Sequence, residues 1–270
     1  MVLTVMVALL ASCKKEATPN DGNKLTLVSC KHTPVTRATV DNEWSGGELV
    51  QVSIDNNAAV SFTAQKNGDL VPVSPIYWQN ASQSISARAW HPATWTFPVD
   101  QRAGLQQADF IFASTVTGIM ASNYKERKLV FQHRTAKVTV KLIAGEDIST
   151  VSGATVAFYG YTTGIPNTTH VGDGVIAGAG NGWIIPQNMN GDTYAALLIP
   201  RDMTGTQFIK ITLGVNEYFY IPEANQAVMQ QGKAYTYNIT VYMTRIEVVE
   251  VADGIIWTEG NEYNTTATFI

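Results

Sequence analysis

Basic residues are not in excess in this sequence of 270 residues, and no positively charged segment stands out. Eighteen Lys and Arg face 22 Asp and Glu, for a formal net charge of −4. A protein that binds nucleic acid or an anionic lipid surface by charge needs a basic face. The composition therefore argues against both, and predicts proteins or neutral sugars as partners.

Cysteine is also scarce, with only Cys13 and Cys30 in the whole chain. Two thiols cannot form the disulfide framework that holds small secreted domains together, so stability has to come from burial of apolar side chains. With 45% apolar and 15% charged residues, the chain has the composition of a folded protein. Cys30 belongs to an alternating run, which favours a structural thiol on a strand over a reactive one.

Clusters of chemically reactive residues are missing as well. The four histidines are scattered without metal-binding spacing, and no nucleophile elbow is present. The glycines from Gly172 to Gly182 lack the context of a phosphate-binding loop, and a plain flexible loop is the simpler interpretation. We predict no catalytic residue, no metal, no cofactor and no enzymatic activity.

The N-terminal residues have the pattern of a sorting signal. Residues 2–10 form an apolar run that is too short to cross a membrane as a helix, and Ala11, Ser12 and Cys13 follow it. This pattern resembles the lipobox of bacterial lipoprotein precursors. The resemblance implies a signal peptide over residues 1–12 and a lipid on Cys13. Residues 13–24 are polar and read as a flexible tether.

Helical periodicity is absent after residue 24, where short runs rich in Val, Ile, Thr and aromatics are bounded by Gly, Pro, Asn and Asp. In the clearest run, 135–143, apolar residues alternate with Lys and Thr. We predict an all-β chain with two tandem β-sandwich domains, 25–134 and 135–270. The predicted strands are 25–30, 49–54, 60–64, 84–90, 95–99, 110–114, 128–131, 135–143, 155–161, 182–185, 194–199, 208–215, 217–221, 234–242 and 246–251.

Aromatic residues gather in the first half, where Tyr77, Trp78, Trp90 and Trp95 fall close together. Exposed indole rings can stack on sugars or anchor protein interfaces, whereas β-sandwich cores also bury Trp. Trp78, Trp90 and Trp95 are therefore candidates either for a ligand or interface surface or for core packing.

Several short motifs, in order, are similar to those of the fimbrillins of Bacteroidales, the subunits and tip proteins of surface pili. They are Cys13 of the lipobox, Thr36-Arg37-Ala38-Thr39, Trp44 with Gly46-Gly47-Glu48, Ala89-Trp90-His91-Pro92, Asp109-Phe110-Ile111-Phe112-Ala113, residues 129–138, Leu198-Ile199-Pro200, Tyr220-Ile221-Pro222, residues 232–239, and Trp257 with Gly260. The resemblance implies transthyretin-like Greek-key sandwiches and a structural, tip or anchor subunit of a fimbrium on the outer membrane.

The resemblance also implies assembly by strand exchange with other fimbrial subunits. A protease would cut after Arg37, the first strand (25–30) would leave, and a donor segment of a neighbour (246–251 or 265–270) would replace it by β-augmentation. Arg37 as an ordinary turn residue is the competing interpretation. A surface lipoprotein that binds a glycan through the three tryptophans is the alternative function, and a host or bacterial receptor is a further partner.

Overall fold

The computed structural model describes residues 24–31, 43–256 and 265–268, with side chains up to residue 248. The predicted signal peptide, Cys13 and Arg37 lie outside the described residues, as does nearly all of the predicted tether. No helix among the residues described is long and apolar enough to span a membrane.

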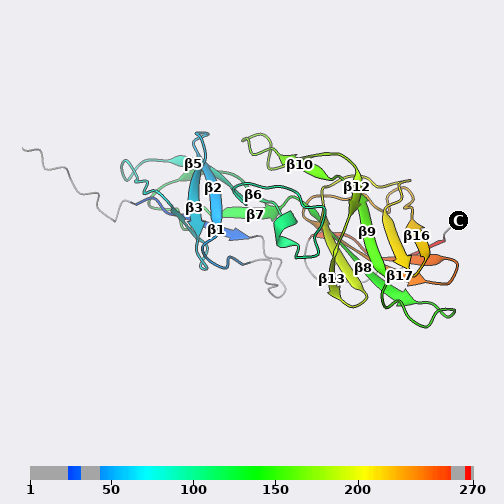
Figure 1. Ribbon diagram of the computed structural model, residues 1–270. Helices are drawn as coiled ribbons and strands as arrows, with labels where there is room; N and C mark the ends of the chain where they lie inside the picture. Colours follow the sequence, from blue (N-terminus) through cyan, green and yellow to red (C-terminus); the bar gives the residue numbers. More distant parts are fainter. Residues whose placement is uncertain (1–23, 32–42, 257–264, 269–270) are drawn as a thin grey trace, which may run out of the picture.

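Seven strands of the N-terminal half are hydrogen-bonded into a closed ring in the order β1-β4-β3-β2-β5-β6-β7 (Figure 1). Their bounds are β1 Leu27–Lys31, β2 Leu49–Ile54, β3 Val60–Ala64, β4 Asp69–Pro72, β5 Ile85–His91, β6 Ile111–Ile119 and β7 Leu129–His133. Neighbours are antiparallel except β1 and β7, which run parallel and close the ring. The N-terminal strand therefore pairs with the last strand of this half.

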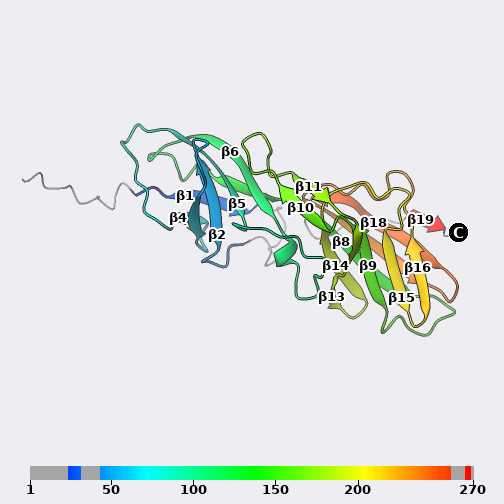
Figure 2. The same ribbon diagram turned by 45° about the horizontal axis from the view of Figure 1, so that its top comes forward.

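The C-terminal half forms one sheet of six strands and one of four, with a separate two-stranded hairpin (Figure 2). The orders are β13-β14-β8-β17-β18-β19, β12-β9-β15-β16 and β10-β11. The bounds are β8 Ala136–Ala144, β9 Thr155–Gly160, β10 Thr163–Pro166, β11 Ile176–Ala179, β12 Gly182–Ile184, β13 Gln187–Asn190, β14 Thr193–Leu198, β15 Ile209–Leu213, β16 Asn216–Tyr220, β17 Lys233–Val241, β18 Ile246–Ile256 and β19 Thr265–Thr268.

Two hydrophobic cores fill these halves, and β6 contributes to both. Ile111 and Ala113 belong to the core inside the ring of β1 to β7, whereas Phe110 and Phe112 belong to the core of the C-terminal sheets. This division follows from the two-residue period of a strand, which points successive side chains to opposite faces. Phe97 and Ala108 also enter the second core. The segment before β6 is thus part of the packing of the C-terminal half.

Polar contacts join the two halves. The buried Gln101 side chain accepts a hydrogen bond from the Leu197 N–H and donates one to the Leu197 carbonyl, both at 2.8 Å. Arg88 Nε on β5 donates to the Thr168 carbonyl, beyond β10, at 2.9 Å. Side chains of the N-terminal half thus bond to the backbone of the C-terminal half, and the predicted domain boundary at 134/135 stays a prediction.

The all-β prediction is confirmed, and most predicted strands are present within a few residues. The strand predicted at 95–99 is wrong, because this segment is irregular and places Phe97 in the second core. Part of the glycine-rich segment predicted as a loop forms β11, whereas β12 coincides with the strand predicted at 182–185. Its glycines serve close packing, since a Cβ on Gly178 would lie 2.2 Å from the Tyr161 ring.

Candidate functional site

The N-terminal strand is the candidate site because it is held on both sides by strands far away in sequence. Leu27 and Val28 pair with Leu70 and Asp69 of β4, and residues 29–31 pair with residues 129–131 of β7. Before the strand, the Leu25 N–H donates to the Ile76 carbonyl at 2.7 Å. Both edges of β1 are therefore used, and its removal would leave β4 and β7 with open backbone groups.

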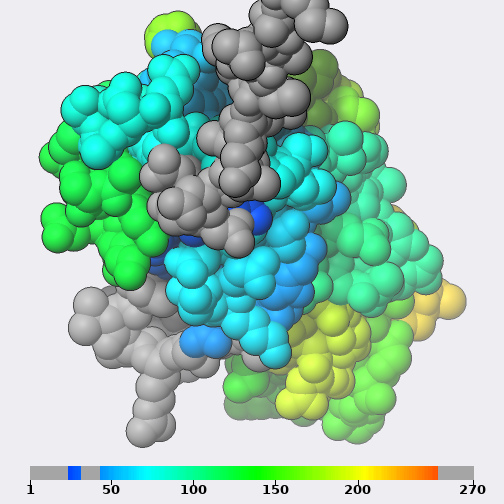
Figure 3. Space-filling model, turned by 90° about the vertical axis from the view of Figure 1, so that its left-hand side faces the viewer, coloured from blue at the N-terminus to red at the C-terminus, as the bar shows by residue number. Residues whose placement is uncertain are grey.

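Alternate side chains of this segment fill the first core. Leu25 is 2% exposed and Leu27 1% exposed, and both pack in the core of the ring. Val28 and Cys30 point to the other face and are partly exposed. Figure 3 looks onto this end, where the dark blue of residues 24–31 lies between later segments of the N-terminal half. The segment therefore fills the groove between β4 and β7, and Leu25 and Leu27 occupy the core behind that groove.

Ser29 marks the point at which β1 is most tightly held. Its N–H and its hydroxyl both donate to the Gly68 carbonyl at 2.8 Å. Its Oγ also accepts a hydrogen bond from the Trp44 indole N–H at 3.1 Å. Trp44 is itself buried and makes an edge-on contact with Phe131 of β7. Ser29 thus connects β1 to the turn before β4 and to the segment leading into β2.

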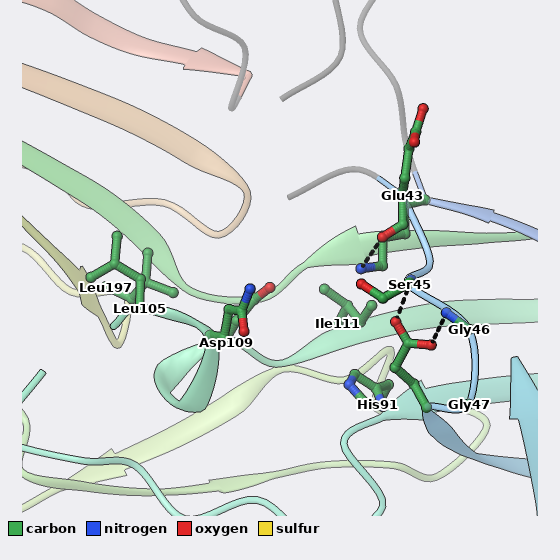
Figure 4. Close-up of a pocket in the computed structure, with 12 residues that line it drawn as sticks. Glu43, Ser45, Gly46, Gly47, His91, Leu105, Asp109, Ile111 and Leu197 are labelled. Atoms are coloured by element: carbon green, nitrogen blue, oxygen red, sulfur yellow. Dashed lines mark hydrogen bonds between the residues drawn. The ribbon is translucent and has the colours of Figure 1, made fainter. Parts of the chain in front are cut away.

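A cavity of about 410 Å³ lies beside the end of β1, close to the junction of the halves (Figure 4). Several of its lining groups are hydrogen-bonded to one another. The Glu48 carboxylate accepts the N–H groups of Ser45 and Gly46, and Lys31 Nζ donates to the Glu43 carbonyl at 3.2 Å. These bonds hold residues 43–48 beside the end of β1.

Two histidines near this cavity have different surroundings. The Nδ1 of His91 lies 2.8 Å from the Leu49 carbonyl, and burial lowers the pKa of His91 below its ordinary value. The Nδ1 of His133 lies 2.9 Å from the Asp109 carboxylate. No group of three or more His, Cys, Asp or Glu gathers as a metal site in the part of the chain that the structure describes. Both histidines thus contact groups of the N-terminal half.

The contact between Gly68 and β1 gives a direct test of how this strand is held. Gly68 has a φ of +90°, and a Cβ there would lie 2.4 Å from the Ser29 carbonyl oxygen. We expect Gly68→Ala to displace β1, with backbone strain of about 1–3 kcal/mol and the loss of hydrogen bonds of about 1 kcal/mol each. Hydrogen exchange of the β1 amides should accelerate strongly.

Gly47→Ala is the matched control for this prediction. Gly47 has a φ of +100°, yet a Cβ there would meet nothing within 4 Å. The two variants share the strain of a positive φ, and only Gly68→Ala adds the collision with β1. Equal loss of amide protection in β1 for both variants would contradict the role assigned to the Gly68 contact.

The three predicted tryptophans do not form one surface. Trp78 is 6% exposed and lies in the first core. Trp90 and Trp95 are half-buried and pack against the second core, Trp90 stacked on Phe112 and Trp95 beside Phe97. Their positions fit the core-packing interpretation, and no flat platform is formed by these three rings.

Sequence reasoning did not single out Ser29 and Gly68 as site residues. Their role depends on the pairing of β1 with β4 and β7. Ser29 has no distinctive pattern around it, and the Asn67-Gly68 pair signals a turn without showing its contact with β1. Trp44 and the glycines after it did carry a signal, because they belong to the motifs on which the family resemblance rests. That signal pointed to the family and not to the contacts that Trp44 makes.

At the other end of the chain, β19 lies at the edge of the six-stranded sheet (Figure 2). Among the described strands it pairs only with β18, over residues 265–268. β18 is different, because it lies between β17 and β19 and buries Ile246 and Val248 in the second core. Of the two donor segments expected from the sequence, the later one includes the edge strand of the sheet, whereas the earlier one has a strand on each side.

Comparisons with solved structures show the same fold in bacterial proteins described as cell adhesion or fimbrial assembly proteins. A candidate cell adhesion protein from Bacteroides uniformis superposes with a TM-score of 0.68 at 18% identity, covering 89% of this chain and all (100%) of its own. A second from Bacteroides ovatus gives a TM-score of 0.64 at 14% identity, covering 87% of this chain and 98% of its own.

A fimbrial assembly protein from Parabacteroides distasonis has a TM-score of 0.52 at 12% identity, covering 91% of this chain and 100% of its own. None of the curated proteins compared with the chain matches it. The family model described as fimbrillin-like matches residues 36–252, which is most of the sequence. The chain therefore belongs to the fimbrillin-like family.

Proposed function

We propose that this protein is a structural or accessory subunit, at the tip or anchor, of a fimbria-like polymer on the cell surface, that it assembles by β-strand exchange, and that it serves adhesion. The family supports a fimbrial, adhesion-related role at the cell surface. The observation that carries the finer proposal is β1, an N-terminal strand that closes a ring between β4 and β7.

Loss of β1 would create a site that only another strand can fill well. Open backbone groups on β4 and β7 would face each other across the groove, and the positions of Leu25 and Leu27 would be left empty. A donor strand with alternate apolar side chains satisfies both requirements at once. Cleavage after Arg37 is the proposed trigger, because Arg37 follows β1 in the chain.

The proposed donor is the C-terminal segment 265–270 of a neighbouring subunit, with 246–251 as the second possibility. As an edge strand, β19 exchanges with a smaller loss of pairing than β18, which is bonded to β17 over residues 246–256. Residues 25–134 would then accept and residues 135–270 donate. Lipid on Cys13 is proposed to hold the precursor at the outer membrane until cleavage.

The experiment is to treat the purified full chain with an Arg-specific protease and to measure mass and oligomeric state. We expect loss of the segment through Arg37 followed by polymers that resist detergent, because an exchanged strand is held by many hydrogen bonds and buried side chains. An Arg37→Ala variant is the control and should stay monomeric. A chain that is cut and remains monomeric contradicts the proposal.

A further inference from the structure

The outer face of the four-stranded sheet carries a strip of aromatic rings, formed by Tyr159, Trp183 and Phe219. The opposite face of the same strands packs into the second core through Phe158, Ile184 and Ile211. Alternation along the strands therefore directs Trp183 and Phe219 away from that core. Tyr159 pairs with Trp183 and lies 5.3 Å from it, ring centroid to ring centroid, while it also packs against the second core. All three are half-buried, so part of each ring is accessible to solvent.

The Trp183 side chain extends across this face from its own strand toward the neighbouring strands. It comes from the edge strand β12, and Phe219 comes from the opposite edge strand β16, yet their ring centroids are 6.2 Å apart. Three strand spacings of about 4.8 Å separate those two backbones. The indole extends over the middle strands, since its centroid lies 5.3 Å from the Tyr159 ring of β9 and 5.2 Å from Lys210 Nζ of β15.

The rim of the strip is polar and carries one ion pair and one arginine. Lys210 Nζ lies 5.2 Å from the centroid of the Trp183 ring and 3.4 Å from Glu217 Oε1, so its charge is paired. The side chains of Lys210 and Glu217 are 27% and 50% exposed, respectively, and can meet a ligand. At the far end, Arg201 stacks on Tyr161 and donates a hydrogen bond to Asn181.

From this arrangement we infer that the Tyr159–Trp183–Phe219 strip binds an uncharged carbohydrate chain. A sugar ring offers an apolar C–H face for the indole and hydroxyl groups for Lys210, Glu217 and the Tyr159 hydroxyl. The inference rests on the proposed adhesive function and names its ligand class. The strip lies on the C-terminal half, away from the β1 groove, so a polymerised subunit keeps it available.

A protein partner fits the strip less well. The apolar core of a protein interface is a contiguous patch from which charged residues are depleted. Here the next outward row is polar, because Thr155 pairs with Thr212 and Thr212 pairs with Glu217. One line of rings bordered by hydroxyls and an ion pair matches a narrow chain of sugars better than a broad protein surface.

The test is to titrate the full chain with mannohexaose, cellohexaose, xylohexaose and maltohexaose and to follow binding by calorimetry. We expect at least one of these neutral sugars to bind, and Trp183→Ala to weaken that binding roughly tenfold or more. Trp183→Phe should restore part of the affinity. Tyr77→Ala, a half-buried aromatic of the N-terminal half, is the matched control and should bind like the unaltered chain.

Failure of all four sugars to bind, or equal binding by Trp183→Ala, overturns the inference. Binding only to a sialylated or uronic acid oligomer, or only to a protein, overturns it too. Polymer formation after cleavage is measured on the same variants. Polymers with no sugar binding leave the fimbrial proposal standing and reject only the carbohydrate site, whereas sugar binding without polymers does the reverse.

Discussion

A chain that begins at residue 38 is expected to bind a synthetic peptide of residues 24–31 in trans and to regain protection of β4 and β7 from hydrogen exchange. Without the peptide, the ring loses Leu25 and Leu27 from its core. Truncating one buried leucine typically costs about 2–5 kcal/mol, and domains are stable by only about 5–15 kcal/mol. We therefore expect the N-terminal half of the shortened chain to be open or unfolded by itself.

The matched control is the same peptide with Leu27→Asp. An unpaired carboxylate in the core position should abolish rescue, whereas Val28→Thr, on the partly exposed face, should leave it nearly unchanged. Mass spectrometry and exchange of the β4 and β7 amides report the result. Full protection of these strands in the shortened chain without peptide would show that β1 is not needed to close the ring.

The second large effect is expected at Phe110, just before β6. This side chain is 1% exposed and contributes to the core of the C-terminal sheets. In the sequence, however, Phe110 belongs to the N-terminal half, because it comes before β6 and β7. We expect Phe110→Ala to lower the free energy of unfolding by about 3–5 kcal/mol. Because the cavity opens in the second core, hydrogen exchange should accelerate in β9 and β15.

Phe62→Ala provides the comparison, since Phe62 is equally buried but lies in the first core. Its loss should accelerate exchange in β2 and β3 without the same effect in β9 and β15. If Phe110→Ala accelerated hydrogen exchange only in the N-terminal strands, Phe110 would not stabilise the protein through the second core.

Local patterns predicted most of the strands. The run 135–143 alternates apolar and polar residues because one face is buried, and it is observed as β8 with Ala136, Val138, Val140 and Leu142 in the core. The short strands β4, β10, β11 and β13 were missed. They contain Pro, Gly or Asn, and pairing with a neighbour overrides their weak intrinsic preference.

The candidate site could be predicted less well than the strands from short-range sequence patterns. β1 was predicted as a strand, and the resemblance assigned it a special role. Its partners are about 40 and 100 residues away along the chain, and such pairing leaves no short-range pattern. The aromatic strip was missed for the same reason, because Tyr159, Trp183 and Phe219 come together only through the order of four strands.

The most direct test of the proposed strand exchange is the mass of the subunits inside polymers formed after cleavage. The account predicts that polymer subunits begin at residue 38, that residues 24–31 are lost in equal amount, and that cross-links join the C-terminal segment 265–270 of one subunit to β4 or β7 of the next. Polymers whose subunits retain residues 24–31 paired with β4 and β7 would contradict it.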